Sequence, residues 1–289
     1  MVIETKSLTK NYGKARGIVN VDLSIDEGEF FGFIGPNGAG KSTTIRTLLG
    51  LISPTSGSAR VFGMPLSKAP QYLNDIGYMP AEAVFYNNMR VGELIAFSAK
   101  MRKKDCSEEA KKLCGIMDLD THKKIDELSL GNRKKVGIVC ALQHKPKLYI
   151  LDEPTSGLDP LMQKTFFELL KERNRDGATI FFSSHVLSEV QKNCTRAAII
   201  RDGKLAAVDS IENLSKSNAR RVVLYGITEV PEILNPKSVE VTEDSISFLF
   251  SGDMKLLVSE LNKLSFSDMK ITEPELDEIF MHYYEKGDK

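Results

Sequence analysis

The octapeptide Gly35-Pro36-Asn37-Gly38-Ala39-Gly40-Lys41-Ser42 decides how the rest of this sequence is interpreted. It matches the pattern G-x-x-x-x-G-K-[ST], and it follows an apolar run at residues 29–34 that is predicted to be a buried strand. Glycines let the backbone wrap so that its N–H groups face phosphate oxygens, and a helix predicted over residues 41–51 adds its N-terminal dipole. The loop therefore predicts phosphate binding, with Lys41 reaching the β- and γ-phosphates and the Ser42 hydroxyl ligating Mg²⁺.

A pair of acids, Asp152 and Glu153, follows the apolar run Leu148-Tyr149-Ile150-Leu151 directly. Sheets in α/β proteins place their ligands at the carboxyl ends of the strands. Asp152 is suited to holding Mg²⁺ directly or through water, and Glu153 to polarising the attacking water as a general base or a water-positioning group. Two acids after a strand can also form an ordinary helix cap or turn. Their occurrence together with the phosphate loop favours the interpretation as an ATP-hydrolysing site.

One histidine, His185, follows a second predicted buried strand at residues 179–182. A histidine there could hydrogen-bond the γ-phosphate and the attacking water, and so sense whether ATP is intact. We therefore take His185 as a catalytic candidate together with Lys41 and Glu153. The other histidines have polar neighbours and are predicted to lie at the surface: His122, His144 and His282.

The composition limits the possible partners. The chain has 289 residues, 42% of them hydrophobic and 27% charged, which suffices for one large α/β domain and a smaller one. Lys and Arg number 39, as do Asp and Glu, so no net charge favours nucleic acid or an anionic membrane. No stretch approaches the ~18 continuous apolar residues of a spanning helix, and Met1 does not lead into a signal-peptide core. The cysteines form no CxxC pair and are expected to be reduced, buried thiols: Cys106, Cys114, Cys140 and Cys194.

Strand-like and helix-like patterns alternate along most of the chain. Residues 147–151 and 178–182 are predicted strands and residues 161–173 a helix, which is typical of a mostly parallel sheet covered by helices. The segment at about 82–146 is rich in Glu, Lys, Leu, Met and Ala and is predicted to be a helical insert. Its expected helices span residues 91–101 and 107–117.

The pattern changes beyond the polar stretch Ser215-Lys216-Ser217-Asn218. We therefore predict a large domain at residues 1–214 and a small α+β domain at residues 215–289. The expected strands of the small domain are at residues 221–227, 239–241 and 245–250, and its expected helices at residues 254–264 and 274–284.

Two further motifs flank the acids: Leu128-Ser129-Leu130-Gly131-Asn132 upstream and Ser156-Gly157-Leu158-Asp159 downstream. With the phosphate loop and the acids, and in this order, they make residues 3–210 resemble the ATP-binding cassette (ABC) family. The resemblance implies an α/β P-loop NTPase fold, with a RecA-like core, an antiparallel β subdomain and a helical subdomain. It also implies that the chain binds ATP and Mg²⁺.

The resemblance further implies a site shared between two subunits. In the family, two cassettes enclose two ATP molecules head to tail, and Ser129 and Gly131 would complete the site of the opposite subunit. Tyr12 would stack on adenine, although a tyrosine in a turn before Gly13 is more often a packing residue, and Asp159 would lie in the loop that links the two sites. The expected nucleotide contacts of the loop are Gly35, Pro36, Asn37, Gly38, Ala39, Gly40, Lys41, Ser42 and Thr43.

The sequence departs from the family pattern at two places. The family signature reads LSGGQ, and here Leu130 and Asn132 differ, although Ser129 can still cap the following helix and leave its N–H groups for phosphate. The family's Mg²⁺-binding glutamine should follow Met79-Pro80, where Ala81 and Glu82 stand instead. Either Glu82 replaces that glutamine or the metal keeps an additional water.

The segment at residues 272–280 resembles the tail of ATPase subunits from bacterial type-2 exporters. The resemblance implies a motor subunit at the cytoplasmic face of the membrane, which powers export through separate membrane-spanning subunits and pairs with a second ATP-binding subunit. No nucleic-acid partner is expected, because acids interleave with the basic stretches 100–104 and 133–135 and so favour a solvated helix face. The alternatives are a soluble ABC ATPase that acts on DNA or ribosomes, and a small-molecule kinase.

Overall fold

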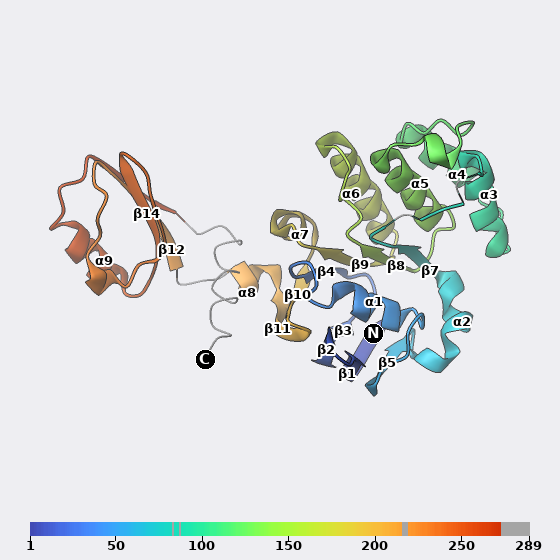
Figure 1. Cartoon of the computed structure of the whole chain (residues 1–289), viewed down its shortest axis with the longest axis horizontal. Coiled ribbons are helices and arrows are strands. Elements are labelled where there is room, and N and C mark those ends of the chain that lie inside the picture. Colours follow the sequence, from blue (N-terminus) through green and yellow to red (C-terminus); the bar gives the residue numbers. More distant parts are fainter. Residues whose placement is uncertain (83, 87, 216–218, 273–289) are drawn as a thin grey trace. The chain divides into compact units, whose positions relative to one another are not determined.

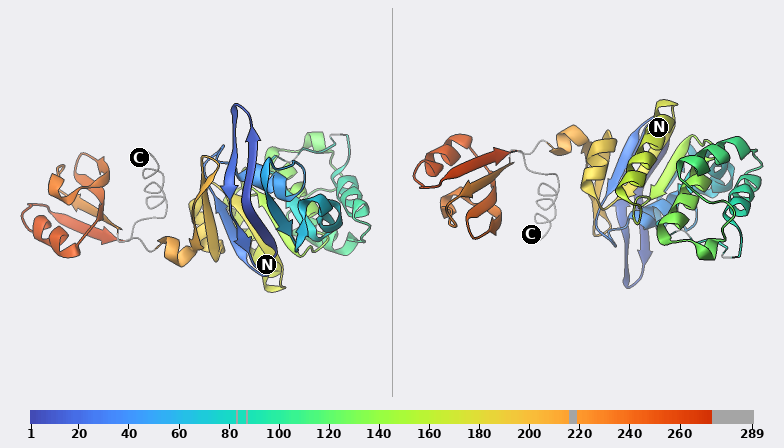
Figure 2. Two further views of the ribbon diagram at one scale, coloured as in Figure 1. Left: turned by 90° about the horizontal axis from the view of Figure 1, so that it is seen from below. Right: turned by 90° about the horizontal axis from the view of Figure 1, so that it is seen from above.

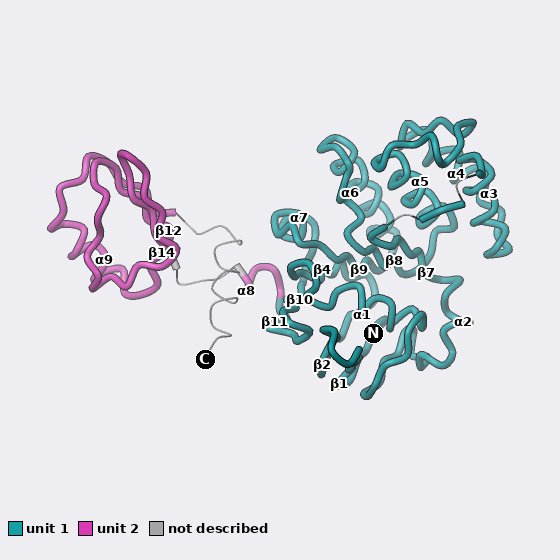
Figure 3. Tube along the Cα trace, in the orientation of Figure 1, with its two compact units in different colours: residues 1–209 teal, residues 210–289 magenta. Residues whose placement is uncertain are grey.

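The phosphate loop follows an inner strand of a six-stranded sheet, and this sheet organises the larger part of the chain (Figure 1). A computed structural model describes residues 1–82, 84–86, 88–215 and 219–272. The chain divides into two compact units, residues 1–209 and 210–289, which Figure 3 colours separately. Each unit has a hydrophobic core of its own.

The strands of the central sheet bring the predicted site residues to one edge. Strands β4, β8 and β9 are buried along their whole length, as their continuous apolar runs predict. All pairings from β10 across to β7 are parallel, so the carboxyl ends of these strands lie at the same edge of the sheet. In spatial order, the strands are β11 (Lys204–Ser210), β10 (Arg196–Arg201), β4 (Phe30–Ile34), β9 (Thr179–Ser184), β8 (Leu148–Asp152) and β7 (Ile76–Met79).

A second, antiparallel sheet packs against helix α1 (Lys41–Leu48) of the first unit. One hydrophobic core joins Ile45 and Leu48 of α1 with Phe33 of the central sheet and Ile3 of the second sheet. The long β1–β2 hairpin of this sheet projects as a blue ribbon in Figure 2. The strands are β1 (Ile3–Tyr12), β2 (Ala15–Val21), β3 (Ser24–Ile25), β5 (Ser56–Val61) and β6 (Met64–Pro65).

The described part of the predicted helical insert contains three α-helices, α3, α4 and α5, which lie together at one end of the first unit (Figure 1). Its first helix has the predicted bounds, 91–101, and the second ends one residue earlier than predicted. Besides α1, the described helices up to residue 215 are α2 (Ala69–Tyr72), α3 (Val91–Met101), α4 (Ser107–Ile116), α5 (Leu130–Leu142), α6 (Pro160–Arg175), α7 (Leu187–Asn193) and α8 (Ile211–Ser215). Short 3-10 turns are η1 (Leu66–Lys68), η2 (Leu73–Asp75), η3 (Ile125–Glu127) and η4 (Glu232–Leu234).

The second unit is a four-stranded antiparallel sheet covered by one described helix, in agreement with the α+β prediction. Its core contains Val222, Phe248 and Leu257. The elements are β12 (Ala219–Tyr225), β13 (Lys237–Val241), β14 (Ser245–Ser251), α9 (Met254–Leu261) and β15 (Asp268–Thr272). The helix predicted at residues 274–284, and nearly all of the exporter-like tail, lie outside the described residues. The assignment of residues 1–214 and 215–289 as separate functional domains stays a prediction.

None of the helices in the described part of the chain is both long and apolar enough to cross a membrane.

The surface position predicted for His144 is wrong, because its side chain is only 5% exposed. The connection from α5 to β8 alternates between the core and solvent: Lys145 and Lys147 are exposed, whereas His144 and Pro146 are buried. Arg102 Nε donates a hydrogen bond to His144 Nε2 at 3.1 Å. Burial, followed by the charge of Arg102, lowers the pKa of His144 from 6.5 to about 4.

This depressed pKa predicts a pH dependence of stability. Below pH 6.5 the unfolded chain binds a proton at His144 that the folded chain does not bind until about pH 4, so stability falls as the pH falls through this window. The shift corresponds to roughly 3 kcal/mol. In urea unfolding series between pH 7.5 and pH 4, we expect His144→Gln to lose less stability than the wild type over this interval. Parallel pH profiles for the two proteins would contradict this explanation.

Candidate active site

At Gly40, the last glycine of the phosphate loop, the backbone tolerates only glycine. Gly40 has a φ of +113°, and a Cβ atom there would lie 2.7 Å from Ile18 Cγ2. Gly40 also precedes the first residue of α1, and it offers no side chain to the free N–H groups of that helix. These N–H groups therefore remain available to an anion.

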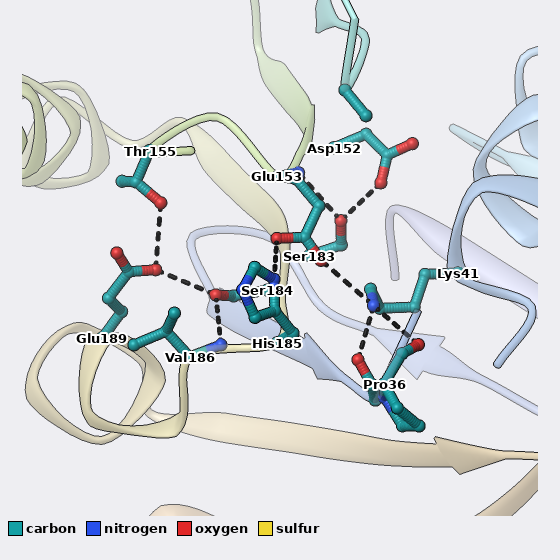
Figure 4. Close-up of polar contacts among 12 residues, drawn as sticks. Pro36, Lys41, Asp152, Glu153, Thr155, Ser183, Ser184, His185, Val186 and Glu189 are labelled. Carbon is teal, nitrogen blue, oxygen red and sulfur yellow. Dashed lines mark hydrogen bonds and ion pairs between the residues drawn. The ribbon is translucent and has the colours of Figure 1, made fainter. Parts of the chain in front are cut away.

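Lys41 is nearly enclosed by the loop, with 5% of its surface exposed. Its Nζ donates to the main-chain oxygen of Gly35 and, at 3.1 Å, to that of Pro36. It also lies 3.0 Å from Glu153 Oε1 (Figure 4). The ammonium group is thus placed between the loop and the catalytic candidate Glu153.

The two acids at the end of β8 have different surroundings. Asp152 is 2% exposed, and its Oδ1 accepts a hydrogen bond from Ser183 Oγ at 2.6 Å. The same Ser183 Oγ accepts a hydrogen bond from the main-chain N–H of Glu153 at 3.1 Å. Glu153 has a φ of +48°, a left-handed conformation that is uncommon for a residue with a side chain. With the Ser42 hydroxyl, Asp152 supplies hard oxygen ligands, so these residues fit a Mg²⁺ ion.

Glu153 links Lys41 to His185, as Figure 4 shows. Its Oε2 lies 2.7 Å from His185 Nδ1, and because a carboxylate can only accept, Nδ1 carries the proton. Its buried Oε1 has no hydrogen-bond partner of good geometry, although Lys41 Nζ is near. One carboxylate oxygen of Glu153 is therefore oriented by the histidine, and the other faces the Lys41 ammonium group.

A pocket of about 250 Å³ is lined by most of the predicted loop residues. It also includes two residues that were not among the predicted contacts, Arg16 and Ala81. Among its described lining residues Tyr12 does not occur; the Tyr12 side chain is 42% exposed at the end of β1, and its contact with adenine stays a prediction. The full lining is Arg16, Pro36, Asn37, Gly38, Gly40, Lys41, Ser42, Thr43, Ala81 and Glu153.

The other predicted site residues, those of the signature at the start of α5 and those of the loop after the acids, lie elsewhere on the same unit. Ser129 Oγ accepts the N–H of Asn132 at 3.3 Å, which confirms the expected cap of α5. The start of α5 packs closely on the loop after the acids, because a Cβ on Gly131 would lie 3.0 Å from the oxygen of Gly157. The exposed side chain of Leu130 covers Gly157.

In that loop Asp159 caps α6, and its Oδ1 accepts the N–H of Met162 at 3.0 Å. The Asp159 carboxylate is thus placed by a local capping interaction at the start of the helix. Its role in linking two nucleotide sites stays a prediction.

Sequence reasoning missed two charged residues beside this centre. Glu189 of α7 accepts hydrogen bonds from Thr155 Oγ1 at 3.1 Å and from Ser184 Oγ at 2.9 Å, and burial raises its pKa. Glu189 thereby joins the loop after Glu153 to the segment before His185 (Figure 4).

The second is Lys134, for which the predicted solvated helix face is wrong, because it is 2% exposed. The helical spacing indicates this burial, because Lys134 precedes the buried Ile138 by four residues and Ala141 by seven, on one face of α5.

The glycine loop, the two acids and the histidine at the carboxyl edge of a parallel sheet define a P-loop nucleoside triphosphatase. The family model described as ABC transporter matches residues 18–156. The chain is 34% identical to the bacitracin transport ATP-binding protein BcrA of Bacillus licheniformis, over 97% of this chain and 96% of that protein.

Solved structures agree with this. The ATP-binding subunit of an ABC transporter has a TM-score of 0.69 and 31% identity over 75% of this chain and 92% of that one. A dimeric bacterial ABC transporter cassette has a TM-score of 0.64 and 25% identity over 72% of this chain and 98% of that one.

The chain therefore belongs to the family of ABC transporter ATP-binding proteins. It is an ATPase subunit of the ABC transporter class.

Proposed function

We propose that this chain powers export from the cytoplasmic face of the membrane by hydrolysing Mg²⁺-bound ATP at Glu153. The observation that supports this proposal most directly is the position of Glu153, whose carboxylate lies 3.0 Å from Lys41 Nζ and 2.7 Å from His185 Nδ1. Transport is supported by the likeness to BcrA, and the direction of transport by the exporter-like tail.

Phosphate binding begins with the loop. The N–H groups at the start of α1 and the Lys41 ammonium would bind the β- and γ-phosphates. Ser42 and Asp152 would hold Mg²⁺, which supplies charge neutralisation to the phosphates. Ala81, in the pocket lining, has no side-chain ligand to add.

Hydrolysis would depend on a change of partner at Lys41. A bound γ-phosphate competes with the Glu153 carboxylate for the ammonium group, because both are anions within reach of the same Nζ. Once released from Lys41, Glu153 would accept a proton from the attacking water, and His185 would keep its carboxylate oriented. Glu189 would hold the two loops that carry these residues.

The second half of the site would come from the paired subunit. Ser129 caps α5, and the N–H groups that begin this helix would face the other subunit's γ-phosphate, next to the loop that carries Asp159. Without these donors the transition-state charge would be only partly stabilised. Tyr12, at the hairpin, would contact the adenine.

We expect the specific ATPase activity to rise with protein concentration and to level off once the dimer is saturated. The measurement is phosphate release over about a thousandfold concentration range, with light scattering on the same samples. Activity that is independent of concentration, in samples that scatter as monomers, would refute the two-subunit site.

A further inference from the structure

Lys134 is a buried cation that the mechanism above does not use. It lies in the second turn of α5, in the helical insert, and its Nζ donates hydrogen bonds to two main-chain oxygens. One is the oxygen of Ala81, after β7, at 2.6 Å, and the other that of Glu153, after β8, at 2.9 Å. One ammonium group thus joins three segments that are far apart in the sequence.

This arrangement is energetically expensive unless the ammonium group is well paired. Removing an ammonium from water costs several kcal/mol, and this burial lowers the pKa of Lys134. The charges of Glu153, Asp152 and Glu82 oppose the shift. An apolar residue would fill the same position on α5 without the desolvation cost, as Val136 and Ile138 do nearby. The cation is therefore best explained by what its two hydrogen bonds hold in place.

The two acceptors belong to residues that line the phosphate pocket. Ala81 and Glu153 both face that pocket, and Lys134 is bonded to their main chains. At Glu153 the bond fixes a residue whose φ of +48° is sparsely populated for a side chain of this kind. A charge-assisted hydrogen bond to its carbonyl oxygen stabilises that conformation and hence the direction of the carboxylate.

We propose that Lys134 is a positioning residue that holds Glu153 in its hydrolytic orientation and couples this orientation to α5. The proposal rests on the proposed role of Glu153 in hydrolysis. The cap of the same helix, Ser129, lies five residues before Lys134, so a displacement of the start of α5 is transmitted to Glu153 through one side chain. The nucleotide of the paired subunit, bound against the start of α5, would in this way influence the orientation of Glu153 in this chain's own site.

The test compares Lys134→Met with Lys135→Met, which removes a partly exposed charge from the next position of the same helix. We expect Lys134→Met to lower kcat at least about tenfold with KM for ATP within about twofold, because positioning is lost and the phosphate loop is intact. Lys135→Met should keep the wild-type kcat. An unchanged kcat in Lys134→Met would overturn the proposal.

Two measurements separate positioning from folding. The rates are normalised to the fraction of chains that bind a fluorescent ATP analogue, so a loss that vanishes on normalisation counts against the proposal. If Lys134→Met does not fold, Lys134→Gln replaces it, because its amide can still donate to one carbonyl. A smaller loss of normalised kcat is then expected, and wild-type kcat would overturn the proposal.

The Glu153→Gln background distinguishes this proposal from the proposed function. If Lys134 acts through Glu153, adding Lys134→Met to Glu153→Gln lowers the residual turnover no further. A full additional loss would show that Lys134 acts elsewhere. Rapid turnover by Glu153→Gln alone would instead refute the assigned role of Glu153, whatever the result at Lys134.

Discussion

Replacing Glu153 with glutamine is expected to lower kcat for ATP about 100- to 10,000-fold while leaving ATP bound. The amide keeps the shape of the carboxylate but cannot accept a proton from water. The substitution also removes the negative charge that lies 3.0 Å from Lys41 Nζ. Phosphate binding then no longer has to displace an anionic partner from the Lys41 ammonium group. ATP affinity should therefore be equal to or higher than that of the wild type.

The measurement pairs phosphate release with calorimetric ATP binding, and Glu168→Gln, an exposed acid on α6, serves as the control. Because ATP would join two subunits without being consumed, the Glu153→Gln protein should also form a stable dimer in Mg²⁺-ATP. Fast turnover would reduce Glu153 to a structural residue. A variant that neither binds ATP nor turns it over would point to damage in the loop.

Replacing Lys41 with alanine should weaken ATP binding roughly 100-fold or more, or about 3 kcal/mol, since charge-assisted bonds to two phosphates are lost. The same change removes the donor from the oxygens of Gly35 and Pro36, so some loss of loop order is expected too. Lys171→Ala, on α6, is the control that keeps the loop intact.

Calorimetric titration of ATP into both variants, with thermal unfolding to confirm that they are folded, measures the effect. Wild-type affinity in Lys41→Ala would show that the loop does not bind phosphate through this residue.

Local patterns in the sequence were enough to predict the fold of the site. The continuous apolar run of β4 and the glycines after it specify a strand, a tight loop and a helix start, all of which involve neighbours in the chain. The cap at Ser129 is equally local. These features could be predicted because the partners of each residue lie within a few positions of it.

Contacts between distant segments could not be predicted in this way. Lys134 lies in a basic run that suggests a solvated surface, and its acceptors are 53 and 19 residues away in the sequence. His144 has polar neighbours, yet the close approach of the α5–β8 connection to Arg102 buries it. For Lys134 and His144 the tertiary environment overrides the local pattern.

The contact between the start of α5 and the loop after the acids also limits which substitutions the chain can accept. A Cβ at Gly157 would lie 3.4 Å from Leu130 Cδ2, which is an ordinary van der Waals contact, so Leu130 does not exclude a side chain there. The restriction comes from the backbone, because Gly157 has a φ of +82°. At Gly131 the restriction is the close approach itself, since a Cβ there would lie 3.0 Å from the oxygen of Gly157. Position 157 is therefore expected to stay glycine whatever residue stands at position 130, and a side chain at position 131 would push the start of α5 away from this loop.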